Sequence, residues 1–256
     1  MKLADKISIV TICLNNELDI RRTMESVIIQ TYPKIEYIII DGLSKDKTLE
    51  KIKDIKKTHP KFDIKVYSKK DNGISHAMNR GIEKSSGQII CHLHAGDYFI
   101  HENVLLHVIQ SYHKFQWEWG VGNSIVIDQN GYELFKYTPG SNKNILKKKN
   151  CIPHQSTFIQ KKLFEEFGLF RVDLQQAMDY ELWLRFAFVG NKNFHVLGFD
   201  TTYFLDGGTS AKIQSLISCL WKIRKNGKIY KIDTNIYSNI FYILRVIAFN
   251  IYRILK

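Results

Sequence analysis

The sequence lacks paired cysteines, a glycine-rich phosphate loop and an apolar N-terminal leader, and each absence excludes a class of protein. Its four cysteines are widely spaced without a CxxC pair, so we expect buried free thiols in a reducing compartment and no metal–thiolate site. No GxGxxG follows the first apolar run and no GxxxxGK[ST] occurs, which disfavours a dinucleotide-binding fold and a P-loop. Without a signal-peptide pattern, the expected location is cytoplasmic.

Acidic residues are scarce towards the C-terminus, and this concentrates the positive charge there. The formal net charge is +12, and residues 212–256 contain nine basic residues and one acidic residue. Such an excess suits nucleic acid, an anionic membrane surface or a phosphorylated substrate. Because no nucleic-acid recognition motif accompanies the charge, nucleic acid is not an expected partner.

The last part of the chain has a helical pattern. Isoleucines recur at steps of three and four residues, at Ile236, Ile240, Ile243, Ile247, Ile251 and Ile254. This spacing predicts one apolar stripe on an amphipathic helix. Arg245 in its middle makes a membrane-spanning helix costly, so the pattern favours a helix lying in an anionic membrane surface, with residues 220–231 adding charge and two aromatics. The alternative is a helix that packs against the rest of the protein.

Strand and helix patterns alternate through the first hundred residues. Buried strands are expected at residues 7–14, 35–40, 64–67 and 89–93. One helix is expected at residues 17–30, a second in the segment after Ser44, which would cap it, and a third after Gly73 to about residue 85. This alternation predicts βαβ units, a parallel sheet and right-handed crossovers. The second half predicts helices at residues 103–113, 161–167 and 178–189, a hairpin from residues 119–127 and 132–137, a loop at residues 143–150 and a strand at residues 155–160.

Carboxylates follow three of the predicted strands, at Asp41, Asp71 and Asp97. In open α/β sheets, ligands bind at the carboxyl ends of the strands. Since no glycine loop is present to hold phosphates, a metal ion is expected to do so, and Asp97 after the HAGD turn suits Mg²⁺ or Mn²⁺. The alternative is that Asp97 only caps a turn.

Several segments together resemble the inverting family-2 nucleotide-sugar glycosyltransferases of GT-A fold. The matching segments are SIVTICLNN, QTYPKIEYIIIDGLSKDKT, DNGISHAMNRGI, LHAGD, HQSTFIQKKLFEEFGLF and MDYELWLRFA. The resemblance covers roughly residues 6–206, and it is nearest to bacterial enzymes that build exopolysaccharide, capsule or lipopolysaccharide. It implies a Rossmann-like mixed sheet flanked by helices, with a donor half at residues 1–100, an acceptor half at residues 101–210 and the amphipathic helical tail at residues 211–256.

The resemblance also implies roles for residues on the donor side. Thr11 and Asp41 would line the nucleoside pocket of a UDP- or GDP-sugar. Asp71 and Asn79, with the turn at Gly73, would contact the donor. The helix that follows Gly73 offers amide groups that suit phosphate.

The reacting groups follow from the same resemblance. Asp97 would hold Mn²⁺ or Mg²⁺ against the diphosphate, and Asp179 would be the general base that activates an acceptor hydroxyl. By position alone, Asp179 is more consistent with a helix cap, and the family resemblance at MDYELWLRF reverses that preference. The implied reaction is a single displacement with inversion, onto a polyprenyl-diphosphate-linked saccharide at the inner face of the plasma membrane. The alternatives are a nucleotide-sugar-binding protein without turnover and a nucleotidyltransferase.

Some positions depart from the family pattern. Gly96 stands where many relatives have a second carboxylate, and His76 stands where close relatives often have Asp. His92 and His94 are interpreted as polar residues at the end of a strand. His154, which opens an acceptor-side segment, is the histidine expected to take part in the site, because a histidine can act as an additional metal ligand.

Overall fold

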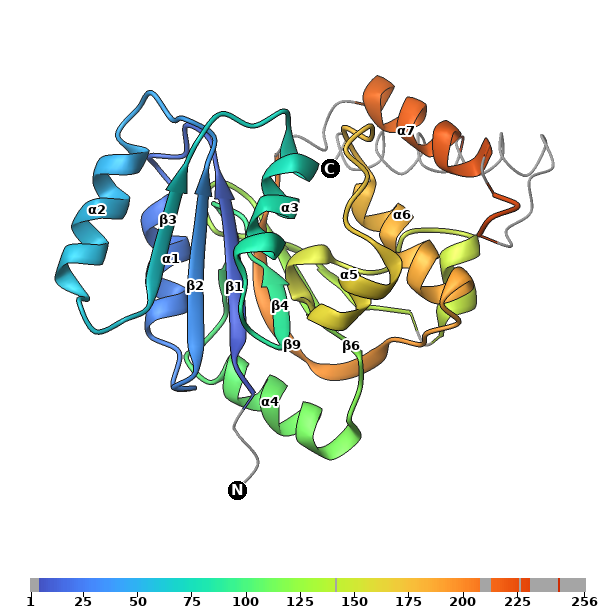
Figure 1. The fold of residues 1–256 in the computed structure, drawn as a ribbon, viewed down its shortest axis with the longest axis horizontal. Helices are drawn as coiled ribbons and strands as arrows, with labels where there is room; N and C mark the ends of the chain where they lie inside the picture. Colours follow the sequence, from blue (N-terminus) through green and yellow to red (C-terminus); the bar gives the residue numbers. More distant parts are fainter. Residues whose placement is uncertain (1–4, 141, 208–212, 226, 231–243, 245–256) are drawn as a thin grey trace.

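Residues 5–140, 142–207, 213–225, 227–230 and 244 are described by the computed structural model. They form a mixed nine-stranded sheet with helices on both faces (Figure 1). The strand order is β3-β2-β1-β4-β8-β6-β9-β5, with β7 paired to β6.

The first half of the chain builds the parallel part of the sheet. Its strands are β1 (Ile7–Cys13), β2 (Ile35–Asp41), β3 (Ile64–Ser68) and β4 (Ile89–His92). The helices between them are α1 (Ile20–Ile28), α2 (Thr48–Thr58) and α3 (Ile74–Lys84). β1 pairs in parallel with β2 and β4, and β2 pairs in parallel with β3, which confirms the predicted βαβ units.

The second half extends the sheet with antiparallel pairs. β8 (Thr157–Gln160) pairs with β4 and with β6 (Trp119–Ile127), and β7 (Glu133–Tyr137) forms the predicted hairpin with β6. β9 (His195–Leu205) runs parallel to β6 and pairs with β5 (Tyr98–Phe99). The helices of this half are α4 (Val104–Phe115), α5 (Lys161–Phe167), α6 (Met178–Leu184) and α7 (Ile213–Lys225).

Side chains alternate across each strand, so the sheet has a hydrophobic core on each face. Ile9 packs with residues of α1, α2 and α4, whereas its neighbour Val10 packs with residues of α3, α5, α6 and α7. The second core contains the stacked rings of Trp119 and Trp183, whose centroids are 5.2 Å apart. All four cysteines are buried free thiols, as predicted.

The structure differs locally from the expectations in three respects, one of which concerns only the type of a helix whose bounds, residues 178–189, were predicted correctly. The sequence did not predict β9, because Gly198 at φ +82° and two register shifts against β6 leave it neither an alternating pattern nor an unbroken apolar run. Ser44 does not cap α2, which begins at Thr48 without a side-chain cap; the Ser44 hydroxyl donates to Asp41 instead. The predicted helix at residues 178–189 changes from α-helix to π-helix at Arg185.

The described part of the C-terminal segment packs partly against the protein. Leu220, Ile223 and Tyr230 belong to the core on the α6 face, and the Tyr230 hydroxyl donates to Glu181 of α6 at 2.7 Å. Part of this segment is therefore buried against the rest of the protein, whereas a segment bound only to a membrane would not be. The isoleucine stripe predicted at residues 236–254 lies outside the described residues. Among the described helices, none has the length and apolar character needed to cross a bilayer.

Candidate functional site

The carboxyl ends of β1, β2 and β3 meet at one edge of the sheet, where Asp41 ends β2. Its buried carboxylate accepts hydrogen bonds from the hydroxyls of Ser44 at 2.5 Å and Ser68 at 2.6 Å. Asp71 lies beside this strand end, since a Cβ on Gly42 would be 2.9 Å from the Asp71 Oδ2. The fold thus brings Asp41 and Asp71 to the same corner of the sheet, as the ends of neighbouring parallel strands predict.

Gly73 forms the turn between Asp71 and α3. It adopts φ +112°, a conformation that favours glycine, and its amide donates to the Asp71 Oδ1 at 3.1 Å. α3 begins after Gly73 without a side-chain cap, so the first N–H groups of the helix have no partner within it.

Two residues predicted to contact the donor, Thr11 and Asn79, form their hydrogen bonds inside the protein. The Thr11 hydroxyl donates to the Leu93 carbonyl at 2.6 Å and lies 3.0 Å from the Tyr37 hydroxyl. The Asn79 amide donates to the Phe170 carbonyl at 2.8 Å and accepts from the Phe170 amide at 2.9 Å. Both side chains are buried, and these hydrogen bonds satisfy their polar groups within the protein. Their contact with a donor stays a prediction.

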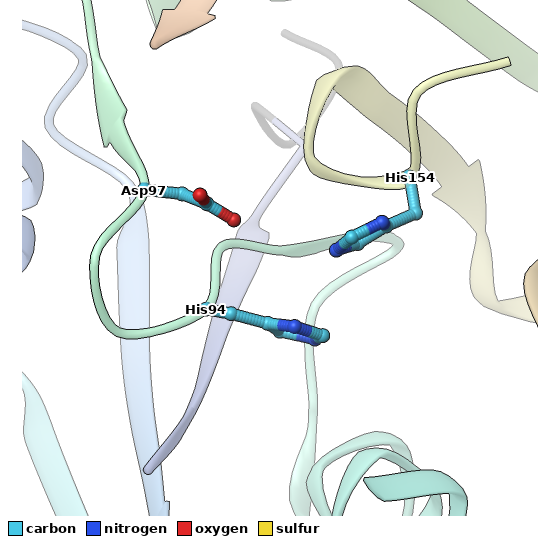
Figure 2. A group of neighbouring side chains, drawn as sticks. All are labelled: His94, Asp97 and His154. Carbon is cyan, nitrogen blue, oxygen red and sulfur yellow. The ribbon is translucent and has the colours of Figure 1, made fainter. Parts of the chain in front are cut away.

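Figure 2 shows the side chains that surround Asp97. One imidazole nitrogen of His94, one of His154 and one carboxylate oxygen of Asp97 lie within 4.8 Å of one another. His94 and Asp97 belong to the turn after β4, and His154 belongs to the 3₁₀ turn before β8. The antiparallel pairing of β4 with β8 therefore brings His154 to a turn that is distant in the sequence.

Burial determines the protonation of this group. Burial raises the pKa of Asp97 to about 8, although a hydrogen bond from the Leu205 amide and the charge of Arg22 oppose the shift. Burial also holds the pKa of His94 well below its usual value and lowers the pKa of His154. At neutral pH the imidazoles are neutral, as a metal ligand must be, and a metal ion would displace the proton of Asp97.

The donor set fits a divalent cation. The Nε2 atoms of His94 and His154 are shielded from solvent and have no hydrogen-bond partner among the described residues. A buried polar atom without a partner costs about 1–3 kcal/mol, and a cation bound to these nitrogens would offset that cost. Two imidazoles favour a transition-metal ion over Mg²⁺, which prefers oxygen ligands.

The turn before Asp97 favours glycine at position 96. Gly96 adopts φ +108°, which residues with side chains rarely adopt. A side chain in this conformation of the turn would therefore be strained.

The histidines near this turn differ in their surroundings. His92 is a polar residue at the end of a strand, as expected, because its Nε2 lies 3.3 Å from the Met78 carbonyl. His94 was given the same interpretation, and its side chain also lies in the group around Asp97, which could hold a metal ion. The sequence pattern that could have indicated this role is the spacing in His94-Ala-Gly-Asp97, which places a nitrogen ligand and an oxygen ligand on one tight turn.

Asp179 lies in the first turn of α6, as predicted, and buried Trp183 anchors that helix. The Asp179 carboxylate accepts a hydrogen bond from the Asn150 amide at 3.2 Å. Its negative charge opposes the lowering of the His154 pKa, so Asp179 lies near the group around Asp97. Asn150 was not singled out from the sequence, since it lies in a segment that was expected to be an irregular loop.

Comparisons with known proteins agree with this architecture. Residues 8–167 match the family described as glycosyl transferase family 2. An uncharacterized glycosyltransferase of Mycobacterium tuberculosis is 30% identical over 195 residues, which cover 74% of this chain and 71% of that protein. The dolichyl N-acetyl-α-D-glucosaminyl phosphate 3-β-D-2,3-diacetamido-2,3-dideoxy-β-D-glucuronosyltransferase of Methanococcus voltae is 34% identical over 116 residues, 44% of this chain and 35% of that protein. A mannosyltransferase structure from Pyrobaculum calidifontis, in complex with GDP-Man and Mn²⁺, has a TM-score of 0.67 at 16% identity, covering 96% of this chain and 74% of that one.

Proposed function

The chain belongs to glycosyl transferase family 2 and has the GT-A fold, and we propose that it transfers a sugar from a nucleotide-diphosphate donor to a saccharide hydroxyl with inversion. The observation that carries this proposal is the group of His94, Asp97 and His154 at the end of β4, near Asp179. A cation site close to a general base suits the displacement of a nucleoside diphosphate by a hydroxyl.

His94, Asp97 and His154 would hold Mn²⁺ or Mg²⁺, and the two imidazoles favour Mn²⁺. A bound cation would offset the negative charge that develops on the leaving diphosphate. The Mn²⁺ named in the Pyrobaculum calidifontis mannosyltransferase structure supports this choice.

The donor would lie along the carboxyl ends of the parallel strands. Asp71 would accept hydrogen bonds from the base or ribose of a UDP- or GDP-sugar, and Asp41, whose buried carboxylate already accepts from Ser44 and Ser68, would shape the pocket for the base or ribose beside it. The amides that open α3 after Gly73 would contact the donor phosphates, because the N-terminus of a helix favours negative charge. Thr11 and Asn79 would support the donor-binding edge of the sheet from the protein interior.

Asp179 would accept the proton of the acceptor hydroxyl. The acceptor oxygen attacks the anomeric carbon from the face opposite the diphosphate; the new C–O bond forms as the bond to the diphosphate oxygen breaks, and the configuration inverts. The hydrogen bond from Asn150 would hold the carboxylate in place.

The acceptor would be a polyprenyl-diphosphate-linked saccharide in bacterial surface polysaccharide synthesis, reached from the cytoplasmic face of the membrane. A dolichyl-linked sugar phosphate in the name of the Methanococcus voltae relative supports a lipid-linked acceptor. The outer side of α7 and the turn after it exposes aromatic, aliphatic and basic side chains, namely Trp221, Lys222, Lys225, Lys228 and Ile229. Such a surface suits anionic headgroups.

The test is the release of nucleoside diphosphate from UDP-, GDP- and dTDP-sugars by the purified protein with Mn²⁺. Asp97→Asn should remove the metal-dependent turnover, while Asp54→Asn on the exposed side of α2 should not. Full activity in EDTA would contradict the metal assignment. Nucleotide-sugar binding without any turnover by the unaltered protein would identify a binding protein rather than an enzyme.

A further inference from the structure

A pocket of about 260 Å³ opens between the start of α3, the segment before α6, and α7. Its polar lining consists of amide and hydroxyl side chains, contributed by Asn72, Ser75, Gln175, Gln176 and Ser215. Its apolar lining comes from Ile74, Val172 and Leu174. Among the residues that the structure describes, no charged side chain lines this pocket.

The pocket adjoins both sides of the proposed reaction. One wall begins at Asn72, which follows Asp71 on the donor side, and the opposite wall ends at Gln176, shortly before Asp179. The hydroxyl that attacks the donor must lie between the donor and the base. A molecule in this pocket is therefore close to the place that the acceptor has to occupy.

The chemistry of the lining selects a neutral polyhydroxyl ligand. Amides and hydroxyls both donate and accept hydrogen bonds, as sugar hydroxyls do, and among the described residues the lining offers no arginine or lysine side chain to a charged group. The donor phosphates are assigned to the backbone amides at the start of α3, not to these side chains. The Ser215 hydroxyl donates to the side-chain oxygen Oε1 of Gln175 at 3.4 Å, so these two side chains lie together in the lining. Val172 is 62% exposed and offers an apolar surface at the rim for the C–H groups of a sugar ring.

We propose that this pocket binds a neutral sugar unit of the acceptor. Gln175, which precedes α6, and Ser215, which belongs to α7, would form hydrogen bonds with the hydroxyl groups of that sugar. The proposal rests on the proposed transferase function. It gives α7 a role in acceptor binding in addition to its packing against α6, and it places the charged diphosphate-lipid end of the acceptor outside the pocket.

The test is saturation-transfer NMR from the full-length protein to methyl glycosides of glucose, galactose, mannose and N-acetylglucosamine, with methyl glucuronide as the charged counterpart. At least one neutral glycoside should bind, and binding should exceed that of the glucuronide. Gln175→Leu should weaken binding about fivefold, as expected for the loss of one hydrogen-bonding amide. Ser215→Ala should weaken it in the same direction.

Gln129→Leu is the matched control, because its amide is exposed on the turn between β6 and β7. The proposal is overturned if no neutral glycoside binds, if the glucuronide binds more tightly, or if the Gln129 variant loses as much binding as the pocket variants. Nucleotide release in the presence of a glycoside that binds tests the proposed function separately, because the proposed reaction needs an acceptor hydroxyl. If release is absent while glycoside binding depends on Gln175, the pocket assignment stands and the transferase assignment does not.

Discussion

The metal binding that we propose would depend on pH through a single carboxyl group, that of Asp97. Its pKa is about 8 in the folded protein without metal, compared with about 3.9 for an exposed aspartate. Because the folded-state pKa is raised, this group contributes stability that is complete below about pH 4 and is lost as the pH rises to about 8. Above that range the buried carboxylate is charged and destabilises the metal-free fold.

We therefore predict that Mn²⁺ affinity rises about tenfold for each pH unit between about pH 6 and pH 8 and then levels off, because binding releases one proton. The lowered pKa values of His94 and His154 keep both imidazoles neutral over this range, so they do not add to the slope. Calorimetric titration with MnCl₂ at several pH values measures this. A slope that persists in Asp97→Asn would assign the proton to another group.

Asp179 is predicted to act on the acceptor rather than the donor. Asp179→Asn should lower kcat by about 10²–10⁴-fold, the usual contribution of a general base, and should leave the KM for the nucleotide-sugar nearly unchanged. Asp173→Asn, at an exposed carboxylate paired with Arg171, is the control. Steady-state kinetics separates the two parameters. If donor affinity falls and kcat is kept, Asp179 belongs to the donor site.

The sequence predicted those site residues whose position follows from the ends of parallel strands. Asp41 and Asp71 lie together for that reason, and Asp97 lies in the turn after β4. The proximity of His94 to His154 could not be predicted, because it depends on the pairing of β8 with β4 across a long separation in sequence. The hydrogen bonds of Asn79 to the Phe170 backbone depend on where the segment around Phe170 lies, and no local sequence pattern specifies that position.

At the scale of elements, the approach of α3 to β1 depends on Gly81. A Cβ at this position would lie 2.2 Å from the Val10 Cγ1, so alanine would force the helix away from the sheet. Glycine-to-alanine gains about 1 kcal/mol in a free helix, but overpacking a core costs about 1–3 kcal/mol or more. We predict that Gly81→Ala lowers the free energy of unfolding by about 1–2 kcal/mol.

Urea denaturation measures this change, and Glu83→Ala on the exposed side of α3 is the control. Equal or greater stability of Gly81→Ala would show that α3 can move without cost. The predicted shift of α3 also moves Gly73 and the pocket beside it, so the variant should bind donor and methyl glycosides more weakly even where it is fully folded.

Elements with one strong local pattern were predicted well from the sequence. β1, β2 and β4 are mainly apolar runs buried on both faces, β3 at the sheet edge is only partly buried, and the helices between these strands have a clear apolar side. β9 was missed because much of it is only partly buried, which leaves its composition mixed. The mixed order of the sheet was anticipated through the family resemblance, since no local pattern specifies which distant strands become neighbours.

At the scale of the whole molecule, basic and apolar side chains collect towards the C-terminus. α7 contributes Leu220 and Ile223 to the core while its outer side exposes Trp221 and Lys225. Each basic residue near an anionic surface adds about 1 kcal/mol of attraction, and apolar side chains at the headgroup boundary add a part that salt does not screen. We therefore expect attachment that salt weakens without abolishing.

Deleting residues 236–256 should release the protein from vesicles that contain anionic lipid, and it should reduce transfer to a polyprenyl-diphosphate-linked acceptor more than hydrolysis of the donor. The double variant Lys225→Glu, Lys228→Glu should weaken attachment to anionic vesicles and make it less sensitive to salt, because both lysines are exposed and contribute to the part of the attraction that salt screens. Vesicle co-sedimentation over a range of NaCl concentrations measures both effects, with neutral vesicles as the control. A truncated protein that is unfolded would show that the deleted segment belongs to the core. A truncated protein that is folded and still bound to vesicles would assign attachment to the exposed side of α7 alone.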